Sequence, residues 1–385
     1  MIRDPVHGYI NLTDEERDIL DTRPLQRLRR VRQMGMSSLV YPSATHTRLS
    51  HSLGVMYVAG EFADSLDLSD AEYKTMRIAG LVHDVGHGPF SHTSDRVARR
   101  HGYTHEERSC EIVRDELSEL IPDEVSISEV EDQILGEANL NVVAGDIDAD
   151  RIDYLNRDAI NTGLRHGTID YQTIIEFSSL VDGQLVFDRK ATFALTELLT
   201  ARMFMHNAIM NHHVSRLAET ILERALEMYV QENSIEDMMN QDDYTMHYEL
   251  LNADNLRIRE LYEKVISRKL LKRAYTIRGD HVPREVVERL SQIDEQSYEE
   301  KIAEEVGMDK TEVIIVTPAM PRSKPSNLII DDEGEIKKLS ALSTIPQHLS
   351  EERARQTRFH VYTKEGAEKP VSEAADMALH SVLDY

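Results

Sequence analysis

The chain has 385 residues, with 44 lysine and arginine side chains against 69 aspartate and glutamate side chains, and a net charge of −25. This balance argues against a broad surface for nucleic acid or an anionic membrane, because both need clustered positive charge. The chain has no apolar run long enough to span a membrane, and its first ten residues lack the apolar core of a signal peptide. The only cysteine, Cys110, cannot form an internal disulfide, so we expect a cytoplasmic protein.

Residues 1–230 carry apolar side chains at helical spacing and are predicted to form a mostly helical region. One helix is expected to begin at Asp14 after a Thr13 cap, and another at Arg23, where Pro24 suits the first turn. Further helices are expected over 53–66, 71–85, 142–160 and 193–229. Between them, residues 184–187 predict a short strand.

The rest of the chain divides in two. Residues 231–275 are polar and predicted to be helical, with a helix over 255–272. Segments rich in β-branched residues at 311–317, 327–330 and 358–362 predict strands, with a helix over 283–306 among them. The sequence therefore predicts a mainly α protein: an all-helical core at 1–230, a helical extension at 231–275 and a smaller α+β lobe at 276–385.

The segment from His83 to His92 reads His-Asp-Val-Gly-His-Gly-Pro-Phe-Ser-His. It follows the apolar end of a predicted helix, and its glycines and proline would break that helix. Imidazole and carboxylate groups together are common ligands of transition-metal ions. A single buried histidine is more often structural, but this cluster favours a metal or catalytic site. His51, just before the helix expected at 53, offers a further ligand.

A second candidate segment contains the alternating residues Asp146, Asp148 and Asp150. A calcium loop is excluded, because arginines stand at 151 and 157, where such a loop needs a glycine and a bidentate glutamate. On a helix, Asp150, Tyr154 and Asp158 would share one face. For the first two aspartates, a solvated acidic helix face is the better interpretation.

The order His51, His83-Asp84, Asp150 matches the H…HD…D signature of HD-domain metal phosphohydrolases. Agreement extends to residues 4–8, 26–29, 33–35, 47–55, 83–92, 104–106 and 150–158. Together these strings closely resemble the HD-domain deoxynucleoside triphosphate triphosphohydrolases, which share the catalytic core of the SAM-and-HD-domain family; the prokaryotic relatives lack the SAM domain, as this sequence does. The resemblance is strong over residues 1–230 and looser afterwards.

This resemblance implies a metal-dependent reaction. His51, His83, Asp84 and Asp150 would bind iron, manganese or zinc, with magnesium on the triphosphate. Such enzymes cleave between the α-phosphate and the 5′ oxygen of a deoxynucleoside triphosphate (dNTP) and release a deoxynucleoside and triphosphate. The metal would polarise the phosphoryl oxygen and activate water.

Catalytic roles are implied for His87, His92, His105, Asp95 and Glu106, which match positions around the scissile bond. His92 is expected to pair with Asp95, and His105 stands next to Glu106. A histidine with a pKa near neutrality would protonate the departing 5′ oxygen, and a carboxylate neighbour would set its tautomer and basicity.

Substrate contacts are implied for a third set: Arg48, Gln33, Met34, Arg151, Tyr154, Asp158, Arg202, His206 and Met210. The planar fork of Arg48 suits two phosphate oxygens, and Tyr154 matches a tyrosine that reads the 3′-hydroxyl. Met210 stands where dNTP-specific relatives carry a tyrosine that closes the pocket against the 2′-hydroxyl. We therefore expect weaker exclusion of ribonucleotides, unless the sugar is gated elsewhere, for example by Gln33.

Asp21, Gln26 and Arg29 match positions that recognise guanine in regulated relatives. The resemblance thus implies activation by GTP or a dNTP and a homotetramer with nucleotides between subunits. The alternative is a solvated helix face, because charge runs usually are solvated.

Two other functions stay open. One is an HD hydrolase that acts on nucleoside monophosphates, (p)ppGpp or cyclic dinucleotides; the phosphate-tail arginines and the Thr104-His105-Glu106 segment argue against it. The other is a non-catalytic nucleotide sensor or RNA-binding protein, which only the arginine-rich segment 23–32 supports.

Overall fold

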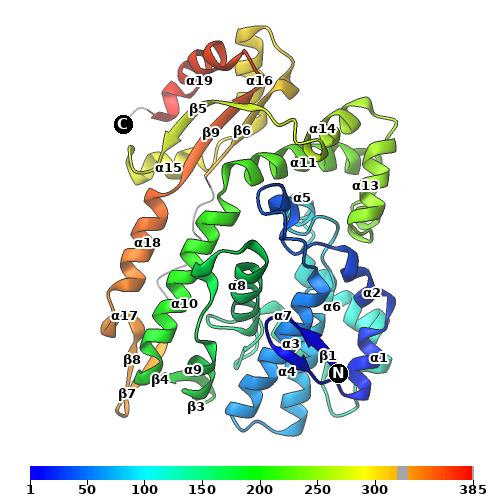
Figure 1. Ribbon diagram of the computed structural model, residues 1–385, viewed down its shortest axis with the longest axis vertical. Helices are drawn as coiled ribbons and strands as arrows, with labels where there is room; N and C mark the ends of the chain where they lie inside the picture. The colour runs from blue at the N-terminus through cyan, green and yellow to red at the C-terminus, as the bar shows by residue number, and fades with distance from the viewer. Residues whose placement is uncertain (319–327, 384–385) are drawn as a thin grey trace.

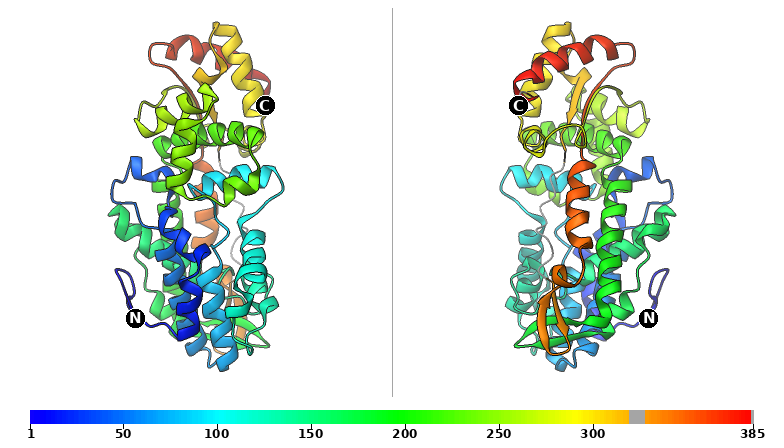
Figure 2. Two further views of the ribbon diagram at one scale, coloured as in Figure 1. Left: turned by 90° about the vertical axis from the view of Figure 1, so that its right-hand side faces the viewer. Right: turned by 90° about the vertical axis from the view of Figure 1, so that its left-hand side faces the viewer.

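A computed structural model describes residues 1–318 and 328–383. A large helical body carries the N-terminus, and a smaller lobe lies at the opposite end of the long axis (Figure 1). The side views show the same two parts (Figure 2). The predicted class is confirmed: the protein is mainly α, with a C-terminal α+β lobe. Within the described ranges, no helix is long and apolar enough to cross a membrane.

Capping residues mark where the helices of the body begin. Thr13, Thr47 and Ser69 each exchange two hydrogen bonds with the residue three positions on, at the starts of α1, α3 and α4. Pro24 lies in the first turn of α2. The helices are α1 (Asp14–Leu20), α2 (Arg23–Arg27), α3 (Arg48–Ser65), α4 (Asp70–Val82), α5 (His92–Arg100), α6 (His105–Ile112), α7 (Ile127–Leu135), α8 (Ala149–Thr162), α9 (Tyr171–Glu176), α10 (Thr192–Met205) and α11 (His213–Glu232).

Two predicted helices begin elsewhere than expected. The Thr47 cap starts α3 five residues before 53, so His51 lies in its first turn and not ahead of it. The helix expected from 142 begins only at 149, because the Asp148 side chain caps α8 by accepting the N–H of Arg151. The apolar residues before this cap are buried in a loop, which explains why their pattern suggested a helix.

Two other predicted helices are each interrupted. The helix expected over 193–229 is α10 and α11, separated by a π turn at His206–Met210 and by a new cap at His212. The helix expected over 283–306 is α15 (Arg284–Leu290) and α16 (Glu295–Val306), because Asp294 caps the second. Apolar periodicity continues through both breaks and hides them.

Small sheets complete the body. β1 (Ile2–Asp4) and β2 (Gly8–Ile10) form a hairpin that was not predicted. A four-stranded sheet has the order β3-β4-β7-β8, with β4 and β7 parallel. Its strands are β3 (Ser178–Val181), β4 (Gln184–Asp188), β7 (Ile329–Asp332) and β8 (Glu335–Lys338). β4 and β7 confirm the strands expected at 184–187 and 327–330, except that residue 327 lies outside the described residues.

The lobe contains a three-stranded antiparallel sheet with the order β5-β9-β6. β6 (Val313–Val316) and β9 (Arg358–Thr363) were predicted, whereas β5 (Lys272–Arg278) was not. α16 and α19 (Glu368–Leu383) pack against this sheet, and α15 packs against α19. Three helices connect body and lobe: α12 (Ile235–Met239), α13 (Asp243–Asn252) and α14 (Leu256–Ile266).

One C-terminal segment returns to the body. β7, β8, α17 (Leu339–Leu342) and α18 (Ile345–Arg355) leave the lobe, and α18 runs beside α10 (Figure 1). Leu328, Ile330 and Leu339 are buried in the core of the body. The division at 230 and 275 stays a prediction, but residues 328–342 pack with the helical core and not with the sheet of the lobe.

Candidate active site

Three helices bring the predicted metal ligands together. His51 lies in the first turn of α3, His83 and Asp84 follow the last residue of α4, and Asp150 lies in the first turn of α8. α3 packs against both α4 and α8. A Cβ atom at Gly86 would lie 2.2 Å from a backbone oxygen of α6, so only glycine lets the loop after α4 approach that helix.

The four side chains face one another. The Nε2 atom of His51 is 2.9 Å from Asp150 Oδ1 and 3.7 Å from Asp84 Oδ2, and Nε2 of His83 is 3.4 Å from Asp84 Oδ1. The Nδ1 atom of His51 donates to Asp153 Oδ2 at 2.7 Å, and Nδ1 of His83 donates to a backbone oxygen of α4 at 2.8 Å. These bonds place each ring proton on Nδ1 and leave the Nε2 lone pairs facing the carboxylates.

This donor set fits a divalent transition metal. In the described chain, both Nε2 atoms are buried without a hydrogen-bond partner. Lone pairs and carboxylates so arranged repel one another unless a cation lies between them. His51, His83 and Asp84 offer ligand atoms that all lie within 4.8 Å of one another. Imidazole and carboxylate ligands together suit zinc, iron or manganese.

The sequence motifs do not reveal Asp153, which orients His51 from behind. Its buried carboxylate also accepts hydrogen bonds from His7 Nε2 at 2.7 Å and from Nε and Nη2 of Arg157 at 2.8 Å. Arg157 donates further to Asp4 Oδ2 at 2.8 Å. Burial opposes ionisation of Asp153, but Arg157 and the two histidines hold its pKa well below its usual range. Asp153 could have been suspected from the sequence, because it lies three residues after the predicted metal ligand Asp150 on the same helix.

The predicted catalytic histidines cluster next to this site. The rings of His87 and His105 stack with centroids 3.8 Å apart and planes at 17°. The expected pairing of His92 with Asp95 is wrong: Asp95 accepts from His105 Nδ1 and from Arg99 Nε, both at 2.8 Å. The reason is that Asp95 also accepts the backbone N–H of His105 at the start of α6. These bonds outweigh burial and lower the pKa of Asp95 below its usual range.

Arg48 joins this cluster to the metal ligands. Its buried guanidinium donates from Nη1 to Asp84 Oδ2 at 2.6 Å and from Nε to Ser91 Oγ at 2.9 Å. Its Nη2 lies 3.4 Å from His92 Nε2. Phe90 and Ser91 have φ angles of 59° and 49°, which are uncommon for residues other than glycine. The turn that presents Ser91 to Arg48 is therefore strained.

Burial keeps two of these histidines neutral. Burial and the nearby Arg48 lower the pKa of His92 to about 3. The same two causes hold the pKa of His87 well below its usual range. Two carboxylates contact the cluster: Nε2 of His87 lies 3.3 Å from Asp84 Oδ1, and Nδ1 of His105 donates to Asp95 Oδ1 at 2.8 Å.

A cavity of about 350 Å³ opens beside the cluster. Its walls include Gln33, Met34, Arg48, Asp84, His87, His92, His105, Glu106, Asp150, Tyr154, Asp158, Arg202, His206 and Met210. Asp150, Tyr154 and Asp158 thus share one face of α8, as predicted. Arg151 is not among the lining residues, because its guanidinium bonds to the Asp148 cap at 2.6 Å.

α10 and the π turn form one wall of this cavity, and α18 packs behind that wall. Asn207, in the π turn, donates to the side chain of Gln356 just after α18. Burial, Arg353 on α18 and then Arg202 lower the pKa of His206 to about 4. Burial and Arg202 likewise lower the pKa of Arg353, while Tyr154 opposes this shift. Arg353 therefore adds positive charge near the cavity. The sequence did not predict this residue, because the resemblance to the family is loose after residue 230.

The predicted guanine-recognition residues lie elsewhere on the surface. Arg29 Nε donates to Gln26 Oε1 at 2.7 Å, and Gln26 Nε2 donates to the backbone oxygen of Leu20 at 2.8 Å. Asp21 is an exposed residue at the end of α1. Among the described side chains, Asp21 has no hydrogen bond to the other two, so only Gln26 and Arg29 are in contact.

Comparison with known proteins identifies the family. Residues 48–158 match the HD domain, and residues 169–382 match the HD associated region. The chain belongs to the HD-domain phosphohydrolases that carry this associated region. Its HD domain is of the kind found in the SAMHD1 dNTPases.

Several relatives are similar over much of the chain. The uncharacterized protein MJ1154 of Methanocaldococcus jannaschii is 33% identical, over 97% of this chain and 81% of that protein. The deoxynucleoside triphosphate triphosphohydrolase SAMHD1 homolog of Dictyostelium discoideum is 34% identical over 58% of this chain, and human SAMHD1 is 32% identical over 58%. The chain spans less than half of either SAMHD1 relative, 48% and 43% of their lengths.

Solved structures share the whole fold. A hypothetical protein from Aquifex aeolicus superposes with a TM-score of 0.77 at 25% identity, over 97% of this chain and 98% of that one. A phosphohydrolase from Bacteroides thetaiotaomicron gives 0.76 at 26% identity, over 94% of this chain and 99% of that one. The arrangement of body and lobe is thus common to these proteins.

Proposed function

We propose that this protein hydrolyses dNTPs to a deoxynucleoside and inorganic triphosphate. The metal would be held by His51, His83, Asp84 and Asp150, and magnesium would accompany the triphosphate. The observation that carries this proposal is one cavity with metal-type ligands at one side and the cations Arg48 and Arg202 in its walls. The names of the SAMHD1 relatives state this activity for those proteins.

Each side chain of the cavity has a role in this proposal. A bound metal would polarise a phosphoryl oxygen and lower the pKa of a water molecule. Arg48 is fixed by Asp84 and Ser91, so its fork is preorganised for phosphate oxygens. Asp95 accepts the Nδ1 proton of His105, so the imidazolium form of His105 would carry its second proton on Nε2 and give that proton to the departing 5′ oxygen. Tyr154 would contact the sugar.

The geometry gives less support to nucleoside monophosphates and to a non-catalytic sensor, whereas (p)ppGpp and cyclic dinucleotides are left to the assay below. An enzyme for monophosphates has no use for the positive charge of Arg202 and Arg353 beyond the metal ligands. A sensor without catalysis would not need Asp153 to fix the tautomer of His51. Two arginines of the segment 23–32 are also committed within the fold, since Arg27 bonds to backbone oxygens and Arg30 to Asp242.

The test is a product assay. Release of nucleoside and tripolyphosphate from all four dNTPs is measured with manganese, iron or magnesium, beside nucleoside monophosphates, (p)ppGpp and a cyclic dinucleotide. We expect stoichiometric nucleoside and tripolyphosphate from dNTPs. Release of orthophosphate or pyrophosphate from dNTPs, or faster turnover of another substrate, would contradict the proposal.

Met210 predicts incomplete rejection of ribonucleotides. Its side chain lines the cavity, is flexible and lacks the fixed shape of a ring. An apolar wall rejects an added hydroxyl by about a hundredfold or less. We expect dGTP to be preferred but GTP to be cleaved, and Met210→Tyr to increase the preference. The measurement is kcat/KM for both nucleotides; complete rejection of GTP by the wild type, unchanged in Met210→Tyr, would refute it.

Arg353 is expected to contribute to triphosphate binding. Arg353→Ala should raise KM for dNTPs by about tenfold with little change in kcat, because a charge-assisted hydrogen bond is worth about 1.5–3 kcal/mol. Arg355→Ala, at an exposed position of the same helix, is the matched control and should keep the wild-type KM. Equal KM values for both variants would remove Arg353 from the site.

Activation by guanine nucleotide, a homotetramer and a cytoplasmic location belong to the same proposal and rest on the resemblance. A ligand that binds between subunits promotes assembly by mass action. Sedimentation with and without GTP and dATP measures this coupling. A monomer of full activity under both conditions would exclude it.

A further inference from the structure

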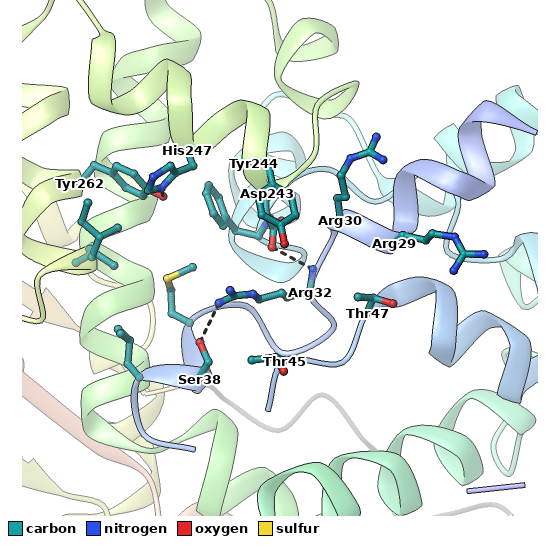
Figure 3. Close-up of a pocket in the computed structure, with 15 residues that line it drawn as sticks. Arg29, Arg30, Arg32, Ser38, Thr45, Thr47, Asp243, Tyr244, His247 and Tyr262 are labelled. Carbon is teal, nitrogen blue, oxygen red and sulfur yellow. Dashed lines mark hydrogen bonds between the residues drawn. The ribbon is translucent and has the colours of Figure 1, made fainter. Parts of the chain in front are cut away.

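A second cavity, of about 540 Å³, lies between the segment 29–47 and helices α13 and α14 (Figure 3). Its inner wall is apolar and aromatic, with Met36, Leu39, Phe90, Tyr262 and Val265. The rings of Phe90 and Tyr262 are 6.1 Å apart, and both side chains are almost fully buried. Hydroxyl groups of Ser38, Thr45 and Thr47 also line it. The size and the mixed lining are those of a small-molecule site.

Arg32 supplies the cation of this cavity. Its guanidinium extends across the cavity, and Nη1 donates to Ser38 Oγ at 3.3 Å (Figure 3). Among the described residues, this guanidinium attracts the carboxylate of Asp243 without forming a salt bridge within 4.0 Å. The nearby carboxylate of Asp243 is committed to backbone N–H groups, those of Phe90 at 2.7 Å and of Arg32 at 3.1 Å. Arg32 is an exposed side chain and keeps guanidinium donors that an anionic ligand could use.

The two other arginines of the lining are differently placed. Arg30 pairs with Asp242 at 2.5 Å, and Arg29 bonds to Gln26. Both guanidinium groups point away from Arg32 in Figure 3. Of the three predicted guanine-recognition residues, Arg29 is in the lining, whereas Asp21 and Gln26 are not. Arg32 is therefore the arginine that reaches across the cavity, whose lining also includes the carboxylate of Asp243.

The same backbone segments separate the two cavities. Arg32, Thr47 and Phe90 line the second cavity, whereas Gln33, Arg48 and His92 line the active-site cavity. Arg32 and Thr47 form a β-bridge. Neighbouring residues of one backbone segment thus line different cavities. A ligand in the second cavity would therefore contact the segments that position active-site residues.

We propose that the second cavity binds a small ligand that joins a planar ring to a phosphate or carboxylate group, and that its occupancy acts on Arg48. The oxyanion would bind Arg32, whose planar fork matches such groups. The ring would lie against Phe90 and Tyr262, since aromatic faces favour stacked or edge contacts. This inference goes beyond the proposed function, because it concerns a site outside the cavity that would bind substrate.

A chain of hydrogen bonds connects the two cavities. Ser91 Oγ donates to the backbone oxygen of Arg32 at 2.6 Å and accepts from Arg48 Nε at 2.9 Å. Arg48 in turn donates to Asp84. Asp243 holds the N–H groups on both sides of this connection, at Arg32 and Phe90. Displacement of Arg32 by a ligand would thus change the position of Arg48.

Calorimetric titration with phenylphosphonate tests the proposal. This probe carries a ring and an oxyanion and has no ester to hydrolyse. The full chain is titrated with saturating tripolyphosphate present, so that the active-site cavity is occupied. We expect one binding site and at least about tenfold weaker binding in Arg32→Gln, since a charge-assisted contact is lost. Arg284→Gln, an exposed arginine of the lobe paired with Glu288, is the matched control and should bind as the wild type.

A blocking variant separates loss of binding from loss of folding. Thr45 is exposed at the lining, and Thr45→Phe should fill the cavity and abolish binding while the unfolding temperature is kept. Binding by Arg32→Gln or Thr45→Phe as tight as that of the wild type would overturn the proposal, as would no binding by the wild type. Neither result depends on dNTP hydrolysis, so a failure here is distinct from failure of the proposed function.

Discussion

His83→Ala and Asp84→Ala should each remove the bound metal and lower turnover by about a thousandfold or more. The metal supplies several kcal/mol of transition-state stabilisation, and each 1.36 kcal/mol corresponds to a factor of ten. Loss of one ligand leaves an incomplete coordination set, and Asp84 also holds Arg48 at 2.6 Å. Elemental analysis of the purified variants measures the metal, and the product assay measures turnover.

Two controls make this result specific. Asp146→Ala changes an aspartate of the loop before α8 that lies outside the cavity lining, and it should keep both metal and activity. Circular dichroism of His83→Ala should match the wild type, because α4 ends before this residue. A variant with full metal content and full activity would refute the assignment of the metal site.

Arg157→Met should lower the free energy of unfolding by about 3–5 kcal/mol, the usual cost of breaking a buried ion pair. Arg157 is 1% exposed and is bonded to both Asp153 and Asp4. Without it, two buried carboxylates would lose their cation. Urea unfolding of the metal-free protein measures the change without a contribution from metal binding.

The exposed pair of Arg284 and Glu288 provides the comparison. Arg284→Met should change the free energy of unfolding by less than about 1 kcal/mol, because exposed ion pairs contribute little. If both variants unfolded alike, the buried network around Asp153 would not stabilise the fold. Metal affinity of Arg157→Met should also fall, because Asp153 would no longer be fixed against His51.

Local signals predicted much of the fold. The cap at Thr13 and the proline at 24 mark real helix starts, and β-branched runs mark β6 and β9. The π turn at 206–210 was not predictable, because the apolar period continues through it. The return of residues 328–342 to the helical core depends on long-range packing, about which a local pattern says nothing.

The site shows the same limit. His51, His83, Asp84 and Asp150 could be predicted as one set of metal ligands from residue type and spacing, because a metal requires imidazole and carboxylate groups. The partner of Asp95 could not be read from spacing, since His92 and His105 are both close in sequence and only the approach of α6 selects His105. Arg353 is far from every motif, and its position depends on the packing of α18 against α10.

The turn at Phe90 and Ser91 has a consequence for heat inactivation. Ser91 combines a φ of 49° with a ψ of −112°, and such conformations cost about 1–3 kcal/mol each. The buried ring of Phe90 and hydrogen bonds to Asp243, Arg32 and Arg48 hold this strained turn. Loss of these few contacts should let it relax before the helices around it unfold. On warming, the enzyme should therefore lose activity several degrees before it loses helical structure, and should regain that activity on cooling.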